Sequence, residues 1–281
     1  MEEENSSSVG RGCRERGKVY LVGCGPGDPD LLSVKTLRVL EEADVVVYDR
    51  LITNDVLKRI PSGAKRVYAG KHPGEPSTPQ GEINELLVSE ANKGRTVVRL
   101  KGGDPFLFGR GGEEAQKLRE AGVSFEVVPG ITSALAVPAY AGIPVTHRDY
   151  ASSVAIVTGH EDPNKPEHRV KWERLAKSVD TIVVLMGVER LGEIVGRLLG
   201  GGLEPETSVA IIEQGTTEVQ MTTVGTLDNI VKKAEERKVK PPAVIVIGDV
   251  VNLRNEISWF RREATVPEGE DYSDHPTGKT D

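Results

Sequence analysis

The sequence predicts an α/β protein of two domains, and three observations support this. Short aliphatic runs alternate with helix-periodic segments over the first 128 residues, an order typical of a mostly parallel sheet covered by helices. A stretch with three prolines and two glycines, residues 129–150, then interrupts the alternation. Beyond it the aliphatic runs lie closer together and helical segments are fewer, which favours a mixed second sheet. We therefore expect a cleft between two α/β domains, a common place for a ligand.

Each element of the first half follows from its own pattern. Four- to eight-residue runs rich in Val and Tyr predict strands at 18–23, 44–49, 64–70, 95–102 and 124–128. Apolar residues at helical spacing predict helices at 30–43, 53–60, 79–94 and 112–122. Asp28 and Pro29 have the residue types of an N-cap and a first helical position.

The second half is expected to begin a new sheet. Aliphatic runs predict strands within 152–160, 180–187, 207–216, 218–225 and 241–249. We place an N-terminal domain at 18–150, junction included, and a C-terminal domain at 151–262. The polar segments 1–17 and 263–281 are expected to be disordered tails.

Charge and cysteine content exclude several classes of protein. The net charge of −7 comes mainly from residues 263–281, which hold six acidic residues and one lysine, so the remainder is close to neutral. A near-neutral core does not indicate a nucleic-acid partner, which usually requires a basic face. No apolar run approaches the roughly 20 residues that span a bilayer, and the first residues contain no signal-peptide core. Two cysteines without a CxxC motif favour a reducing compartment, and we expect a cytoplasmic protein.

The loop VGCGPGDPDLLS after the first strand resembles a dinucleotide-binding fingerprint but departs from it. G-x-G-x-x-G requires glycine at position 28, where this chain has Asp28. Pro26 has no N–H to donate to a phosphate, and Asp28 would repel one. The loop therefore indicates close approach of the backbone to a ligand other than NAD or ATP, which disfavours a dehydrogenase.

A second glycine-rich loop, KGGDPFLFGRGG, follows the strand at 95–102. Gly102 and Gly103 come at the carboxyl end of that strand, where α/β sheets bind ligands, and they allow backbone groups to approach closely. Asp104 would suit a ligand with a positive centre and a ribose, and Leu107 would supply an apolar wall. The alternative is an ordinary β-turn with a solvent-facing Asp104.

Polar side chains follow several other strands or lie in the junction. Asp49 and Lys71 close the second and third strands, and four basic residues could meet in the same cleft: Arg50, Arg110, His147 and Arg148. Arginine is suited to bidentate recognition of carboxylates. Each of these residues taken alone could equally be a helix cap or part of a surface ion pair. The five histidines show no metal-ligand spacing, and neither a G-x-S-x-G elbow nor a Cys–His pair indicates a hydrolase.

Four stretches together carry a family resemblance: LVGCGPGDPDLLSVKTLRVLEEADVVVYDRL, VVRLKGGDPFLFGRGGEE, VVPGITSALAVPAYAGIPVTHRDYASSVAIVTGH and LMGV. Over about residues 18–262 the chain resembles the uroporphyrinogen-III C-methyltransferases, within the S-adenosylmethionine-dependent tetrapyrrole methylases. The first loop is shared by the whole superfamily, whereas GGDPFLFGRGGEE and THRDYASS are more specific. The resemblance implies the two-domain tetrapyrrole methylase fold, a homodimer, and two methyl transfers that convert uroporphyrinogen III through precorrin-1 to precorrin-2, in sirohaem or cobalamin-type biosynthesis.

The resemblance also implies roles for individual residues. It makes Asp49 a proton acceptor and Lys71 a proton donor. It assigns S-adenosylmethionine contacts to Pro26, Gly102, Gly103, Asp104, Leu107, Thr132, Ser133, Met186, Gly215 and Ala243. A substrate with eight carboxylates would give Arg50, Arg110, His147 and Arg148 a joint purpose, and no metal is expected. Two alternatives stay open: a methylase of this fold with another acceptor, such as a later corrin precursor, a protein or RNA, and a tetrapyrrole- or nucleotide-binding regulator without turnover.

Overall fold

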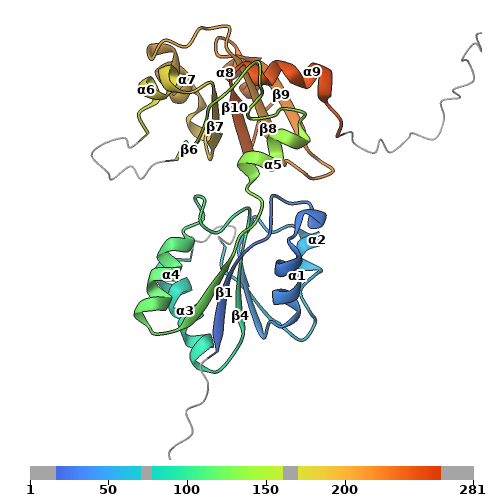
Figure 1. Cartoon of the computed structure of the whole chain (residues 1–281), viewed down its shortest axis with the longest axis vertical. Coiled ribbons are helices and arrows are strands. Elements are labelled where there is room, and N and C mark those ends of the chain that lie inside the picture. The colour runs from blue at the N-terminus through green and yellow to red at the C-terminus, as the bar shows by residue number, and fades with distance from the viewer. Residues whose placement is uncertain (1–16, 71–77, 161–169, 261–281) are drawn as a thin grey trace, which may run out of the picture.

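The computed structural model describes residues 17–70, 78–160 and 170–260. These residues form two five-stranded sheets placed end to end, with helix α5 (Ser133–Tyr140) between them (Figure 1). The predicted α/β class with two sheets is thus confirmed. The predicted disordered tails, residues 1–17 and 263–281, fall outside the described residues except for Gly17, which is buried and donates a 2.9 Å backbone hydrogen bond to Ala91.

The first sheet is entirely parallel, as the alternation of elements predicts. Its order is β3-β2-β4-β1-β5. The strands are β1 (Lys18–Gly23), β2 (Val45–Tyr48), β3 (Lys65–Tyr68), β4 (Val97–Lys101) and β5 (Ser124–Val128). The helices are α1 (Val34–Glu41), α2 (Asn54–Leu57), α3 (Gln80–Asn92) and α4 (Gly111–Glu120).

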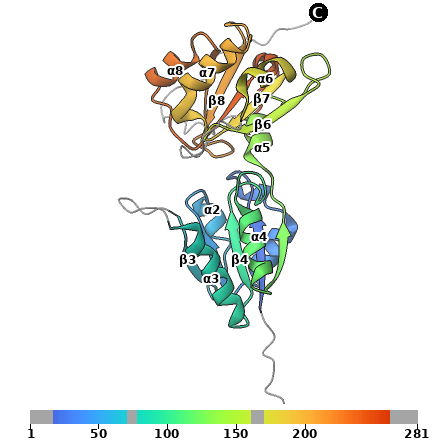
Figure 2. The same ribbon diagram turned by 90° about the vertical axis from the view of Figure 1, so that its left-hand side faces the viewer.

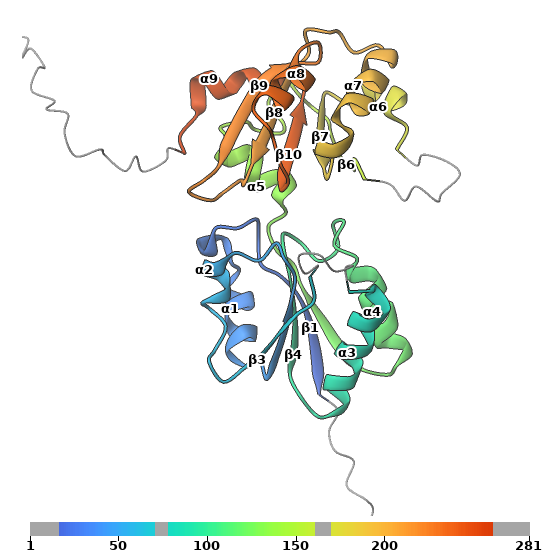
Figure 3. The ribbon, with the colours of Figure 1, turned by 180° about the vertical axis from the view of Figure 1, so that it is seen from behind.

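Period-2 alternation divides the strand side chains between two cores. Val22 and Val46 pack with α1 and α2 on one face, whereas Leu21 and Val47 pack with α3 and α4 on the other. Figure 3 shows these two helix pairs on opposite sides of the sheet. Helices on both faces leave the carboxyl ends of the strands as the exposed edge that can carry polar groups.

Two expected helices of this half are shorter than predicted. Asp28 does cap Pro29, but the turn is a separate 3₁₀ helix, η1 (Pro29–Leu31), and α1 begins anew after Ser33, whose hydroxyl accepts from the N–H of Thr36. The segment 53–60 forms only the four-residue helix α2. The second N-cap, Ser33, divides the predicted helix in two, and apolar periodicity alone does not reveal this break.

The second sheet is mixed, as predicted. Its order is β6-β7-β10-β8-β9, with β6 parallel to β7 and the other pairs antiparallel. The strands are β6 (Val154–Thr158), β7 (Thr181–Leu185), β8 (Ser208–Glu213), β9 (Met221–Thr226) and β10 (Ala243–Ile247).

Among the described residues, the second half has four α-helices and the first half has five, which agrees with the expectation of fewer helices there. The second half contains α6 (Trp172–Ser178), η2 (Val188–Arg190), α7 (Leu191–Gly200), α8 (Ile230–Glu236), η3 (Asp249–Leu253) and α9 (Arg254–Ile257). Helices α6, α7 and α8 pack on one face, over Ile182, Val184 and Ile211. Helix α5 packs on the opposite face, over Val183 and Ala210, and Figure 2 shows α5 between the sheets. Within the described residues no helix has the length and apolar character needed to cross a membrane.

Candidate functional site

The two sheets present loop-bearing edges to each other. In the first sheet these are the carboxyl ends of β1, β2, β4 and β5, all parallel. In the second sheet, Ala243 at the start of β10 pairs with Glu213 at the end of β8, and Val244 pairs with Leu185 at the end of β7. The loops after β7 and β8 and the start of β10 therefore lie along one edge.

The loops after β1, β4 and β5 are fastened together through their glycines. Gly103 donates a 2.7 Å hydrogen bond to the carbonyl of Gly25, and Gly25 donates one of 3.2 Å to the carbonyl of Gly103. A Cβ at Gly23 would lie 2.6 Å from the Gly103 carbonyl oxygen, and a Cβ at Gly130 would overlap the same oxygen. These glycines are required because three backbone segments meet where side chains would not fit.

The Asp104 carboxylate shapes its own loop. One oxygen accepts from the N–H groups of Phe106 (2.8 Å) and Leu107 (3.1 Å), and the other accepts from Gly130 (3.2 Å). The side chain therefore joins the loop after β4 to the loop after β5. This arrangement differs from the alternative of an ordinary turn with a solvent-facing Asp104, and a direct contact of Asp104 with a ligand stays a prediction.

Gly23, Gly103 and Gly130 are together called the glycine cradle below. Several residues predicted to hold the methyl donor gather around it. The backbone of Thr132 and Ser133 lies beside Gly103, within 4 Å of where its Cβ would be. Leu107 is half-buried and packs against the core of the second domain, including Ala134 and Val244. Gly102 lies against Leu51, in the loop after β2.

The second-domain residues lie on the facing edge. Met186 follows β7, is 52% exposed and has a φ of 56°. A Cβ at Gly215 would overlap the Val137 side chain of α5, so only glycine fits there. Ala243 opens β10 beside the end of β8. The three residues thus share one sheet edge, as their predicted joint role requires.

The loop of Pro26 and the loop of Gly215 meet directly. The N–H of Asp28 donates to the hydroxyl of Thr216 (3.2 Å), and the Asp28 carboxylate accepts from the Tyr140 hydroxyl (2.7 Å). The Gln220 side chain accepts from the N–H of Thr216 and donates to the carbonyl of Tyr140. This set, Asp28, Tyr140, Thr216 and Gln220, is called the interdomain clasp below. Burial, followed by the hydrogen bond to Asp28, raises the pKa of Tyr140 to about 12.

Backbone strain is concentrated in the same loops. Within the described part of the chain, six residues other than glycine have a positive φ, and only Lys238 lies outside these loops. The others are Phe108, Arg110, Met186, Gln214 and Thr216. Such conformations persist only where surrounding contacts impose them, and they cluster at ligand sites.

Asp49 follows β2 and lies at the margin of the cradle. Its carboxylate accepts a 3.1 Å hydrogen bond from the N–H of Leu51 and lies 3.5 Å from the guanidinium of Arg99. The Cys24 thiol is buried near it, and burial, followed by the negative charge of Asp49, raises the pKa of this thiol to about 12. Cys24 therefore stays a neutral thiol.

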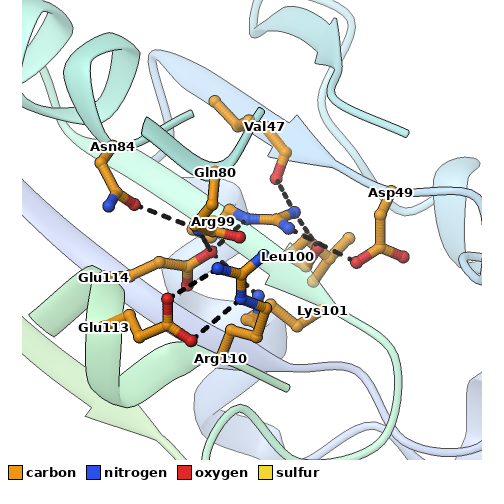
Figure 4. Close-up of polar contacts among 10 residues, drawn as sticks. All are labelled: Val47, Asp49, Gln80, Asn84, Arg99, Leu100, Lys101, Arg110, Glu113 and Glu114. Carbon is orange, nitrogen blue, oxygen red and sulfur yellow. Dashed lines mark hydrogen bonds and ion pairs between the residues drawn. The ribbon is translucent and has the colours of Figure 1, made fainter. Parts of the chain in front are cut away.

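A buried charge cluster behind Asp49 was not anticipated from the sequence. It consists of Arg99 and Lys101 of β4 and Glu114 of α4 (Figure 4). The signal was available, because two basic residues spaced by two in an apolar strand must share one face. Burial, followed by the positive charge of Arg99, lowers the pKa of Lys101.

The basic residues predicted to bind carboxylates are only partly brought together. Arg50 is exposed, and its N–H lies beside Gly70 at the end of β3, next to Asp49 in sequence and space. Arg110 is the N-cap of α4, has a φ of 58° and forms a bidentate ion pair with Glu113. The hydrogen bonds to Glu113 raise the pKa of Arg110. Lys71 lies outside the described residues.

His147 and Arg148 occupy a separate turn after α5. His147 and Ala151 exchange two backbone hydrogen bonds of 2.9 Å, and the ring of His147 packs against Tyr150. Both His147 and Arg148 line a surface hollow of about 400 Å³. No contact among the described residues joins this turn to Asp49 or Arg110, so a shared role stays a prediction.

The described residues include no group of three side chains suited to hold a metal.

Comparison with known proteins identifies the family. A family model described as Tetrapyrrole (Corrin/Porphyrin) Methylases matches residues 18–231. The chain is 56% identical over 239 residues to the S-adenosyl-L-methionine-dependent uroporphyrinogen III methyltransferase of Methanosarcina barkeri, covering 85% of this chain and 94% of that protein. It is 49% identical to the siroheme synthase of Pseudoalteromonas atlantica over 89% of this chain, but spans only about half, 54%, of that longer protein.

A solved structure has the same fold. The uroporphyrin-III C-methyltransferase of Thermus thermophilus, complexed with S-adenosyl homocysteine, aligns with a TM-score of 0.73 and 42% identity, covering 84% of this chain and all of that one. The glycine-bound loops, the facing sheet edges and these similarities lead to one conclusion: the chain belongs to the tetrapyrrole (corrin/porphyrin) methylases.

Proposed function

We propose that this chain is an S-adenosylmethionine-dependent C-methyltransferase that methylates uroporphyrinogen III twice, through precorrin-1, to precorrin-2. The observation that carries the proposal is the glycine cradle of Gly23, Gly103 and Gly130, with the Asp49 carboxylate, 3.5 Å from Arg99, at the adjoining strand end. The M. barkeri relative is named for the same donor and acceptor. The product would enter sirohaem or cobalamin-type biosynthesis.

The cradle fits the donor on structural grounds. Its walls are backbone groups and the half-buried Leu107, and a Cβ at Gly103 would be in van der Waals contact with the backbone of Ser133 (3.7 Å) and Thr132 (3.8 Å). We assign donor contacts to the loop of Pro26, Gly102 and Gly103 on one edge and to Met186, Gly215 and Ala243 on the other. Asp104, Leu107, Thr132 and Ser133 complete the proposed set. When bound, S-adenosylmethionine supplies a methyl group on a positively charged sulfur.

The residues of this chain would align the acceptor with the donor, and they would accept and donate the protons that the reaction requires. A pyrrole carbon forms a bond to the methyl carbon as the bond to sulfur breaks, which requires in-line alignment in a site that excludes water. The positive charge left on the tetrapyrrole is then removed by loss of a proton from a bridge carbon, for which Asp49 is the proposed acceptor. Lys71 is the proposed donor where the ring system takes up a proton in a tautomeric shift, and each proton taken up is balanced by a further proton lost from the ring system. Arg50, Arg110, His147 and Arg148 would bind substrate carboxylates.

The direct test is incubation of the purified protein with methyl-labelled S-adenosylmethionine and enzymatically prepared uroporphyrinogen III. Incorporation of two labelled methyl groups into the tetrapyrrole, read by mass spectrometry, is the expected result. Donor binding without transfer would contradict the proposed acceptor, and failure to bind S-adenosylhomocysteine would contradict the donor.

A variant pair tests the role of Asp49. D49N should lower turnover by at least about 100-fold, the usual effect of losing a general base, while S-adenosylhomocysteine still binds. D55N is the matched control, because Asp55 is an exposed residue of α2 paired with Lys58. Wild-type turnover in D49N would remove Asp49 from the mechanism.

A homodimer is proposed from exposed apolar side chains. Ile131 and Leu135 are 43% and 45% exposed beside and on α5, and Met221 and Val224 are 47% and 41% exposed on β9, an edge strand. Exposed apolar groups on an edge strand favour association with another chain. Sedimentation at several concentrations should give the mass of two chains. We also propose a cytoplasmic location and a domain boundary near residue 150.

A further inference from the structure

The charge cluster behind Asp49 has an unusual distribution of hydrogen bonds. One carboxylate oxygen of Glu114, Oε1, accepts from Arg99 Nε (3.1 Å), Lys101 Nζ (3.0 Å) and Gln80 Nε2 (3.1 Å). The other oxygen, Oε2, is buried and has no hydrogen-bond partner among the described residues. The Glu114 side chain is fully buried, and those of Arg99 and Lys101 are 4% and 5% exposed. Figure 4 shows these side chains converging from α3, α4 and β4.

A buried charge must be balanced locally, because desolvation would otherwise destabilise the fold. Two cations, Arg99 and Lys101, face one buried anion, Glu114, which leaves one positive charge over. Asp49, 3.5 Å from Arg99 and 26% exposed, supplies the second anion. Asp49 therefore completes a set of two cations and two carboxylates, and of these four side chains it is the most exposed.

Arg99 is held in place by more than Glu114. Its Nη1 donates to the carbonyls of Val47 (3.4 Å) and Leu100 (3.1 Å), which directs Nη2 toward Asp49. A guanidinium fixed at both ends cannot turn away when Asp49 gains a proton. The position of Arg99 thus depends on Glu114 on one side and on the backbone of β2 and β4 on the other.

We propose that Glu114 is a positioning residue for the methyl-transfer reaction: it holds Arg99 and Lys101 behind Asp49 and cancels one of their two charges, so that Asp49 stays ionised yet basic enough to accept a proton. This inference rests on the proposed function. Without Glu114, Asp49 would face two uncompensated cations and become a weaker base. Without Lys101, Glu114 and Arg99 would cancel and Asp49 would become a stronger base.

Within residues 17–70, 78–160 and 170–260, the other ionisable groups near Asp49 do not replace this control. The Cys24 thiol from the loop after β1 is buried and neutral. Arg50 follows Asp49 directly and is exposed, so solvent weakens its effect. Arg110, at the start of α4, is paired with Glu113 at the surface.

The test measures the pKa of Asp49 directly, by the ¹³C shift of its carboxyl carbon against pH in the full chain, assigned with D49N. E114Q keeps the shape of the side chain and removes its charge, and the pKa of Asp49 should fall by about 1 unit. K101M removes a cation, and the pKa should rise by a similar amount. E120Q, which removes an exposed carboxylate from the same helix, should leave it unchanged.

Kinetics give an independent readout. The acid limb of kcat/KM against pH should move with the pKa of Asp49 in each variant, and kcat of E114Q should fall about 3-fold at neutral pH because a weaker base transfers protons more slowly. E114D, which restores the charge, should recover part of the shift. If wild-type protein shows no turnover, the proposed function fails, but the carboxyl titration still tests the cluster.

Two results would overturn the inference. One is a folded E114Q whose Asp49 titrates as in wild type, since Glu114 would then serve only the fold. The other is a shift of the same sign in E114Q and K101M, which charge balance cannot produce. If E114Q does not fold, the rise expected for K101M decides the question.

Discussion

The hydroxyl of Tyr140 lies 2.7 Å from Oδ2 of Asp28 and donates a hydrogen bond to it. Asp28 belongs to the loop after β1 in the first domain, and Tyr140 ends α5, which packs on the second sheet. The other oxygen of Asp28 accepts from the N–H of Asp30 and so fixes the loop itself. One carboxylate therefore sets the shape of the Pro26 loop and its attachment to the second domain.

Removal of that hydroxyl should loosen the interdomain clasp. Y140F keeps the ring packed against Trp259 and Phe260 but leaves Asp28 Oδ2 without its donor. The free energy of unfolding should fall by about 1–2 kcal/mol, and S-adenosylhomocysteine should bind several-fold more weakly. Thermal unfolding and calorimetric titration measure both. Y150F, at an exposed tyrosine, should change neither quantity, and wild-type affinity in Y140F would show that the clasp does not support the donor site.

The glycine cradle should reject even one methyl group. In G130A the new Cβ would overlap the carbonyl oxygen of Gly103 and the backbone of Gly23, neither of which can move as a flexible side chain would. We expect a loss of about 3 kcal/mol in unfolding free energy and loss of S-adenosylhomocysteine binding. G81A in α3 is the control, because nothing lies within 4 Å of its Cβ and alanine favours the helix. Unchanged melting and binding in G130A would contradict the packing described for the three loops.

Arg110 should affect the acceptor and not the donor. Its side chain is 56% exposed and forms a bidentate pair with Glu113, whose place a substrate carboxylate can take. R110A should raise KM for uroporphyrinogen III about 10-fold and leave the affinity for S-adenosylhomocysteine unchanged. R119A removes an exposed arginine from the same helix and should leave both values as in wild type. An equal loss of donor affinity in R110A would place this residue in the donor site instead.

The environment of Glu90 predicts how the stability of the fold changes at acid pH. Burial opposes its ionisation, but hydrogen bonds from Lys93, Lys65 and Arg95 outweigh burial and lower its pKa to about 2. Since the folded-state pKa is below the unfolded value, the stabilisation is complete above about pH 4.5 and is lost as pH falls toward 2.

The change E90Q should therefore cost about 1–2 kcal/mol at pH 7, a figure reduced for the exposed partner cations. The difference from wild type should shrink as pH falls from 4.5 to 2. Denaturant unfolding across this range measures it, and E85Q, at an exposed position of the same helix, should show no such trend. A difference independent of pH would mean that Glu90 acts through packing and not through its charge.

The fold was largely predictable because its elements are local. The run Lys18–Gly23 forms β1, and Ser124–Val128 forms β5, with the predicted bounds, since each apolar run is bordered by turn residues. Helix α5 was missed because Pro138 argues against a helix, and tertiary packing of its alanines overrides that preference. Helix α7 has three glycines within it and Gly201 at its C-cap. Because glycine disfavours helices, residue propensities do not predict α7 despite its apolar face.

The site was predictable only where one loop carries the information. Gly102, Gly103 and Asp104 could be singled out because they follow one strand directly. The bond from Tyr140 to Asp28 joins residues 112 positions apart, and nothing in either local sequence indicates it. The cluster of Arg99, Lys101 and Glu114 depends on how α4 packs across β4, which the alternation of elements leaves open.

The positive φ angles of Phe108, Arg110, Met186, Gln214 and Thr216 have a consequence for engineering. Glycine or asparagine at these positions would relieve backbone strain and is the substitution that a search for thermal resistance would select. Each such gain would fall in a loop that we propose faces the donor or the acceptor, and it would remove a side chain from that loop. Screens that reward heat tolerance alone should therefore enrich inactive proteins at these five positions, whereas screens that also require turnover should leave them unchanged.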